Sequence, residues 1–125
     1  MIIGNFRDLK VYKKAFALAM DIFEITKKFP VEEKYELTDQ LRRSSRGVCR
    51  AIGEGYRKRQ YPKHFSSKLS DADMENTETQ VSLDFAWQCE YISQEKYQNL
   101  RNGSEEVGRM LNHMIENPEK YRPRD

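Results

Sequence analysis

The sequence predicts an all-α protein, specifically an antiparallel up-down four-helix bundle. Along four long segments, apolar residues recur at steps of three and four, and no segment alternates with the period of a β-strand. The four prolines, at positions 30, 62, 118 and 123, lie near the expected segment ends, where a helix tolerates them. Short connections between consecutive helices favour antiparallel neighbours.

The first two helices are expected at about 6–29, followed by Pro30, and at about 37–57. The apolar face of the first is wider than one packing partner needs. It comprises Leu9, Tyr12, Phe16, Ala19, Met20 and Phe23, widened by Val11, Ala15, Ile22 and Phe29. The core stripe expected on the second helix is Leu37, Leu41, Ser45, Val48, Ile52 and Tyr56.

The third helix is expected to begin near Pro62, a favourable first-turn residue, and to reach Ile92 at most. It carries two apolar stripes on opposite sides. The first is Phe65, Leu69, Ala72, Asn76, Thr79 and Leu83, and the second is Met74, Val81, Phe85 and Ile92. A helix that is apolar on two sides is usually covered on both, so the second stripe predicts a subunit interface.

The fourth helix is expected after Ser93, a favourable N-cap, and to fade at Asn117-Pro118. Its apolar positions are Tyr97, Leu100, Val107, Leu111, Met114 and Ile115. We therefore expect one domain over residues 1–117 and a loose tail over residues 118–125.

The composition favours a single globular domain in a reducing compartment. The 125 residues are 38% apolar and 34% charged. No apolar run approaches the roughly 20 residues that span a bilayer, and the first residues lack the pattern of a secretory signal. Cys49 and Cys89 stand alone in separate segments, which favours free thiols. We expect a cytoplasmic protein that has no contact with membranes.

The charge is distributed unevenly. Residues 40–63 hold eight basic residues and one acidic residue, although the net charge of the whole chain is only +2. Residues 71–90, by contrast, hold six acidic residues and no lysine or arginine. At 100° per residue, Arg43, Arg46, Arg50 and Arg57 gather on one face of the second helix, away from its core stripe.

Three interpretations of this basic segment stay open. It is a solvated surface, or it pairs with the acidic third helix of the same or a neighbouring subunit, or it binds the RNA backbone. Arginine outnumbers lysine, which favours contacts with carboxylate or phosphate over simple solvation. The tyrosines at 56 and 61 are positioned to stack on unpaired bases or to pack at the helix junction.

Several segments resemble the bacterial four-helix-bundle family encoded by intervening sequences in 23S ribosomal RNA genes. The most specific part is Phe29, Pro30, Glu33, Tyr35, Leu37, Gln40, Leu41, Arg42, Arg43, Ile52, Glu54 and Gly55. Ala51 stands where the family usually has asparagine, and Met74-Glu75 replaces a pair of small residues. The resemblance implies a cytoplasmic ring, a homopentamer, with a connection to RNA. The accessory proteins of diversity-generating retroelements are distantly similar.

Catalytic and metal-binding patterns are weak. Arg59 and His64 have the spacing of a HEPN-type ribonuclease motif, but Pro62 separates them. Neither histidine belongs to a Glu-x-x-His pair, and the cysteines form no Cys-x-x-Cys pair. Glu54 is spaced for helix-surface pairs with Arg50 and Arg57. We expect no catalysis, cofactor, metal or small-molecule substrate.

The sequence therefore favours a non-enzymatic RNA-binding or scaffold protein that forms a homo-oligomer. The residues expected to bind nucleic acid are Arg57, Lys58, Arg59, Lys63, Arg42 and Arg43. Those expected at the subunit interface are Arg46, Arg50, Glu54, Glu78, Met74, Val81 and Phe85. A purely structural assembly module with a protein partner is the alternative, and the ribonuclease is a minor one.

Overall fold

Four long helices make up most of the structure, a computed structural model that describes residues 5–123. They are α1 (Lys10–Thr26), α2 (Leu37–Tyr56), α3 (Pro62–Gln88) and α4 (Gln94–Glu116). Three 3-10 helices, η1 (Phe6–Asp8), η2 (Val31–Glu33) and η3 (Pro118–Tyr121), complete the secondary structure of these residues, which contain no strand. The all-α class with four helices is confirmed.

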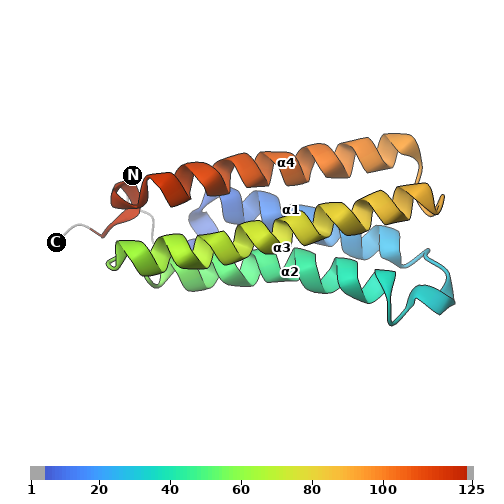
Figure 1. The fold of residues 1–125 in the computed structure, drawn as a ribbon, viewed down its shortest axis with the longest axis horizontal. Helices are drawn as coiled ribbons and strands as arrows, with labels where there is room; N and C mark the ends of the chain where they lie inside the picture. Colours follow the sequence, from blue (N-terminus) through green and yellow to red (C-terminus); the bar gives the residue numbers. More distant parts are fainter. Residues whose placement is uncertain (1–4, 124–125) are drawn as a thin grey trace.

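The four helices lie side by side, with the α1–α2 and α3–α4 connections at one end and the α2–α3 connection at the other (Figure 1). α2 packs against α1 and α3, and α4 packs against the same two helices. Tyr91, between α3 and α4, donates a hydrogen bond from its hydroxyl to Glu33 in the α1–α2 connection at 2.8 Å. This bond ties the two connections together at one end.

The helix ends follow local chemistry. The hydroxyl of Ser93 accepts a hydrogen bond from the Lys96 amide at 3.1 Å, so the predicted N-cap of α4 is confirmed. Pro62 is the first residue of α3, as predicted. The third helix, however, ends at Gln88, and Glu90 takes a left-handed conformation with φ 64° just beyond it.

Two apolar clusters form the core along the bundle. One centres on Ile52, Phe65 and Leu69, and the other on Ile22, Leu41 and Leu83. The predicted core stripe of α2 and the first stripe of α3 are buried throughout. Within residues 5–123, no helix has the length and apolarity that crossing a membrane requires.

The expected face of the first helix is partly wrong. Phe16 and Met20 are 49% and 45% exposed, because α1 turns a different side toward the core. The buried side consists of Val11, Ala15, Leu18, Ala19, Ile22 and Thr26. The sequence pattern contained two adjacent apolar faces, and only the one with the small alanines packs inside.

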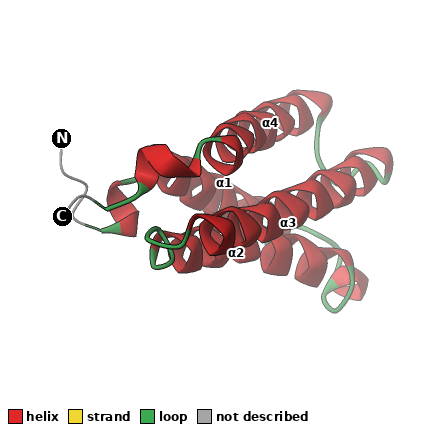
Figure 2. Ribbon diagram, turned by 60° about the vertical axis from the view of Figure 1, so that its left-hand side comes forward, coloured by secondary structure: helices red, strands yellow, loops and turns green. Residues whose placement is uncertain are grey.

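The first and last described elements, η1 and η3, lie at the same end of the bundle as the α2–α3 connection (Figure 2). Part of the tail that was expected to be loose packs on the bundle, because the Tyr121 ring stacks on Phe65 with the ring centres 5.7 Å apart. Residues 1–4 of the expected domain and residues 124–125 of the expected tail lie outside the described residues.

Candidate nucleic-acid interface

The turn between α2 and α3 carries the main cluster of basic residues. The amides of Lys58 and Tyr61 donate hydrogen bonds of 2.9 Å to the carbonyls of Gly55 and Lys58, so the turn is compact. Arg57, Lys58 and Lys63 are exposed around it. The ordered backbone thus presents three cations on one short segment, at an end of the molecule.

Arg59 is fixed against the core. Its Nε donates a hydrogen bond to the carbonyl of Tyr56 at 3.0 Å, and its guanidinium lies 3.8 Å from the centre of the Tyr56 ring. Tyr56 itself is 8% exposed and packs at the helix junction. Tyr61, in contrast, is 52% exposed beside the ring of His64. Of the two tyrosines at this turn, Tyr61 is therefore the one whose ring is exposed enough to stack on a nucleic-acid base.

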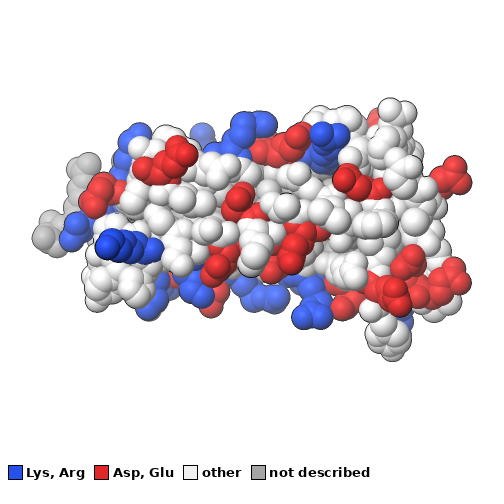
Figure 3. All heavy atoms as spheres, in the orientation of Figure 1, with Lys and Arg blue, Asp and Glu red and all other residues white. Residues whose placement is uncertain are grey.

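The tail adds cations that the sequence reasoning missed. Stacking of Tyr121 on Phe65 brings η3 to the first turns of α3, and Lys120 and Arg122 beside it are exposed. The one hint was an aromatic residue shortly after Pro118 in an otherwise charged segment. Figure 3 shows mainly acidic side chains at the opposite end, on the face in view.

Arg42 and Arg43 lie well away from this turn. At 1.5 Å per residue, Arg43 is about 21 Å along α2 from Arg57. The Nε of Arg42 donates to Thr26 Oγ1 at 2.8 Å, and Arg43 pairs with Asp39 at 3.5 Å. The structure therefore gathers Arg57, Lys58, Arg59 and Lys63 at one end, and separates the other two predicted residues from them.

A groove of about 1050 Å³ runs between α2 and α3. It brings together five of the residues predicted at a subunit interface: Arg50, Glu54, Met74, Glu78 and Val81. Phe85 is 60% exposed one turn further along α3. Arg46 does not line the groove, and its guanidinium lies 5.8 Å from the Phe23 ring of α1.

Glu75, which the sequence analysis named only as a departure from the family pattern and assigned to no site, lines the groove. Its carboxylate packs over Gly47, where a Cβ would collide with it. Burial raises the pKa of Glu75, and the charge of Glu78 and a hydrogen bond with it raise the pKa further, while Arg50 and Arg43 lower it. The sequence signal that could have indicated this arrangement was the three-residue spacing of Glu75 and Glu78 on the expected third helix.

The ion pairs do not follow the expected pattern. Within residues 5–123, no pair shorter than 4.0 Å joins an α2 arginine to an α3 carboxylate. Glu54 pairs with Lys68 at 3.9 Å, and not with Arg50 or Arg57. The described residues of one chain thus contain no ion pair between basic α2 and acidic α3, although Arg50 and Arg43 lie close enough to Glu75 to lower its pKa.

Arg59 and His64 lie on different elements, because Pro62 begins α3 between them. Arg59 belongs to the turn and is bound to Tyr56, whereas His64 is exposed on α3. Over the described part of the chain, no three or more His, Cys, Asp or Glu side chains converge as a metal site would require.

The family model of the 23S rRNA-intervening sequence protein matches residues 7–113, which include all of α1, α2 and α3. The chain belongs to this family. The basic turn between α2 and α3 lies within the matched residues, and so does the groove between the same helices. The matched region ends before η3, so Lys120 and Arg122 lie outside it.

A solved structure supports the family fold. It is a protein of unknown function from the S23 ribosomal protein family of Bacteroides thetaiotaomicron, which is 30% identical to this chain. The TM-score is 0.75, and the match covers 84% of this chain and 97% of the other. No curated protein matches the chain.

Proposed function

We propose that this member of the 23S rRNA-intervening sequence family is a non-enzymatic, cytoplasmic protein that binds structured RNA. In this proposal the chain is an antiparallel up-down bundle that assembles into a ring-like homo-oligomer, a pentamer. Each copy presents the basic turn at the α2–α3 end to the phosphate backbone. The observation that carries the proposal is a set of exposed cations on and next to a hydrogen-bonded turn: Arg57, Lys58 and, in the first turn of α3, Lys63.

Phosphate contacts need accessible cations, and a fixed turn presents them without a large ordering cost. Arg59 adds a guanidinium that is already oriented by Tyr56. Tyr61 supplies an exposed ring, and aromatic rings stack on unpaired bases, which are more common in structured RNA than in duplex DNA. Repetition of the turn in an oligomer raises the avidity for one RNA molecule.

A triple charge reversal tests the proposal. Arg57→Glu, Lys58→Glu and Lys63→Glu change exposed side chains, so the bundle is expected to stay folded. The matched control, Lys96→Glu, Arg101→Glu and Arg109→Glu, makes the same change in net charge on exposed positions of α4. We expect the first variant to weaken RNA binding about tenfold or more at low salt, and the control to change it less than about threefold.

Equal losses in the two variants would show that only net charge matters, and no loss in either would refute the interface.

Tyr61→Ala separates stacking from charge. It is expected to weaken binding to single-stranded loops by about 1–3 kcal/mol, whereas Tyr61→Phe keeps the affinity.

The second candidate function is an assembly module with a protein partner. It is favoured by the exposed apolar stripe of Met74, Val81 and Phe85, which are 57%, 50% and 60% exposed. Under this alternative, both charge-reversed variants leave the cellular role of the protein intact, and a stripe variant abolishes it.

A further inference from the structure

Two exposed apolar strips lie on either side of α2. The α1 strip consists of the exposed Phe16 and Met20 with the half-buried Tyr12 and Phe23, and the α3 strip consists of the exposed Met74, Val81 and Phe85. The exposed fractions at the centres of the two strips are similar, 45% for Met20 and 50% for Val81. Large exposed apolar surfaces on a soluble protein commonly mark contact sites.

The α1 strip is surrounded by positive charge. Lys27 of α1 lies 4.8 Å from the centre of the Phe23 ring, and Arg42 and Arg46 of α2 lie 4.7 and 5.8 Å from it. Lys13 is exposed on the same side of α1, three residues before Phe16. The acid on this side, Glu24, is already paired with Lys27 at 3.3 Å.

The α3 strip borders negative charge. Met74 and Val81 line the groove between α2 and α3 together with five carboxylates, Asp39, Glu54, Asp71, Glu75 and Glu78, against two arginines, Arg43 and Arg50. Lys68 offsets part of this charge at the edge of the groove, where it lies 3.9 Å from Glu54 and 4.0 Å from Asp71. Glu75 and Glu78 have no ion pair within the described residues.

We infer that the occupant of the α2–α3 groove is the α1 strip of a second copy of this chain. The two surfaces are both apolar at the centre and opposite in charge at the rim, which is the complementarity that fixes a specific contact. Contact of either surface with itself would place like charges together. The inference rests on the self-assembly in the proposed function, and not on RNA binding.

Such a contact is heterologous, because the surface used by one copy differs from the surface used by its neighbour. Each added copy leaves one free strip and one free groove until the assembly closes. Since α2 borders both surfaces, the α2 helices of successive copies come together. Arg43 and Arg50, which line the groove, and Arg46, beside the Phe23 ring of the strip, then lie at the contact between copies.

Two single substitutions test the contact. Met20→Glu places a negative charge in the α1 strip, and Val81→Glu places one in the groove; both positions are about half exposed, so folding should be retained. The mass is measured by light scattering on a sizing column, and helicity by circular dichroism. We expect an oligomeric wild type and a folded monomer for each variant. Ala17→Glu, an exposed position on the α4 side of α1, should keep the wild-type mass.

Mixing the two variants is decisive. Met20→Glu keeps an intact groove and Val81→Glu keeps an intact strip, so the mixture should form a two-chain complex that goes no further. The inference is overturned if the wild type is a monomer or if either single variant is an oligomer. It is also overturned if the mixture forms no two-chain complex. RNA binding by the monomeric variants, weakened by lost avidity but present, would show that the RNA interface stands separately.

Discussion

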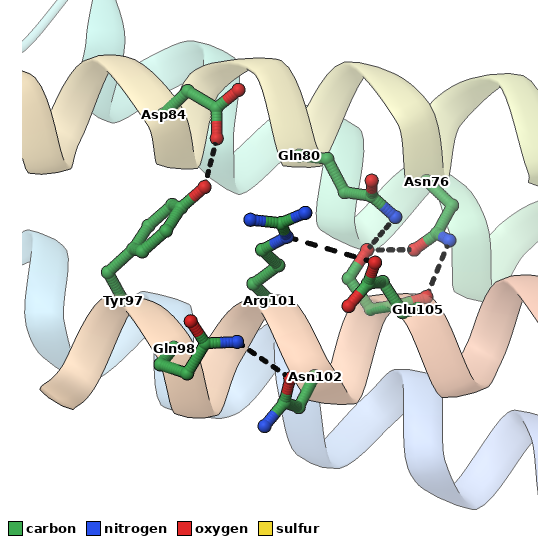
Figure 4. Close-up of polar contacts among 9 residues, drawn as sticks. Asn76, Gln80, Asp84, Tyr97, Gln98, Arg101, Asn102 and Glu105 are labelled. Atoms are coloured by element: carbon green, nitrogen blue, oxygen red, sulfur yellow. Dashed lines mark hydrogen bonds and ion pairs between the residues drawn. The ribbon is translucent and has the colours of Figure 1, made fainter. Parts of the chain in front are cut away.

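Asn76 is a buried amide whose hydrogen bonds run to one residue of the neighbouring helix. Its side-chain nitrogen donates to the Ser104 carbonyl at 2.8 Å, and its oxygen accepts from the Ser104 hydroxyl at 2.8 Å (Figure 4). Gln80 donates to the same hydroxyl at 3.0 Å. Since a buried polar group that loses its partners is costly, this cluster fixes how α3 and α4 sit together.

Asn76→Ala should therefore destabilise the fold by about 1–3 kcal/mol, because the buried Ser104 hydroxyl loses its acceptor and the Ser104 carbonyl loses a donor. Urea unfolding followed by circular dichroism measures the change. Gln98→Ala is the matched control, since Gln98 makes an exposed hydrogen bond to Asn102 at 2.9 Å. A control loss as large as that of Asn76→Ala would contradict the importance of the buried cluster.

Glu75 gives the stability a dependence on pH. Burial and Glu78 favour its protonated form, so its pKa is higher in the folded chain than the ordinary value of 4.5. The stabilisation that this shift provides is complete below that value, and it is lost as the pH rises through the raised pKa of the folded state. Glu75→Gln removes this titration and should flatten the decline in unfolding free energy.

Urea unfolding at about pH 5 and about pH 7 measures that decline, and the same substitution at the exposed Glu95 is the matched control. An unchanged decline in Glu75→Gln would show that Glu75 is not its source. Gly47 is part of the same arrangement, because any larger residue there would push the Glu75 carboxylate out of its place.

At the scale of helices, the sequence predicts ends better than faces. Pro62 and Ser93 act through local chemistry that is visible in the sequence, and both ends were predicted correctly. The buried side of α1 was not predicted correctly. The exposed Phe16 and Met20 are four residues apart, which is the same helical spacing as that of the buried Leu18 and Ile22. Periodicity shows that a helix has an apolar face, but the neighbouring helices decide which of two such faces is buried.

Ser93→Ala should destabilise the fold by about 1 kcal/mol, because the Lys96 amide loses its cap. Chemical unfolding measures the loss, and Ser93→Asp, which restores a capping oxygen, should recover most of it. If Ser93→Ala and Ser93→Asp are equally stable to within about 0.3 kcal/mol, the cap does not stabilise α4.

At the scale of the whole molecule, the sequence showed the charge asymmetry but not its division among three surfaces. The basic residues of 40–63 divide among the turn at the end of α2, the α1 strip and the α2–α3 groove. Helix geometry alone placed Arg43, Arg46 and Arg50 on one outward face. It could not show that Arg42 is tied to Thr26, since that contact depends on the packing of α1.

The measurement that tests the central claim most directly is binding of the wild-type protein to structured RNA, followed by fluorescence anisotropy across a series of salt concentrations. We predict an affinity that falls linearly in log–log form, with a slope that counts several phosphate contacts per RNA. A slope shallower than that of the wild type is expected for the triple variant with Arg57→Glu, Lys58→Glu and Lys63→Glu. No binding at about 50 mM salt, where electrostatic association is strong, would contradict the account.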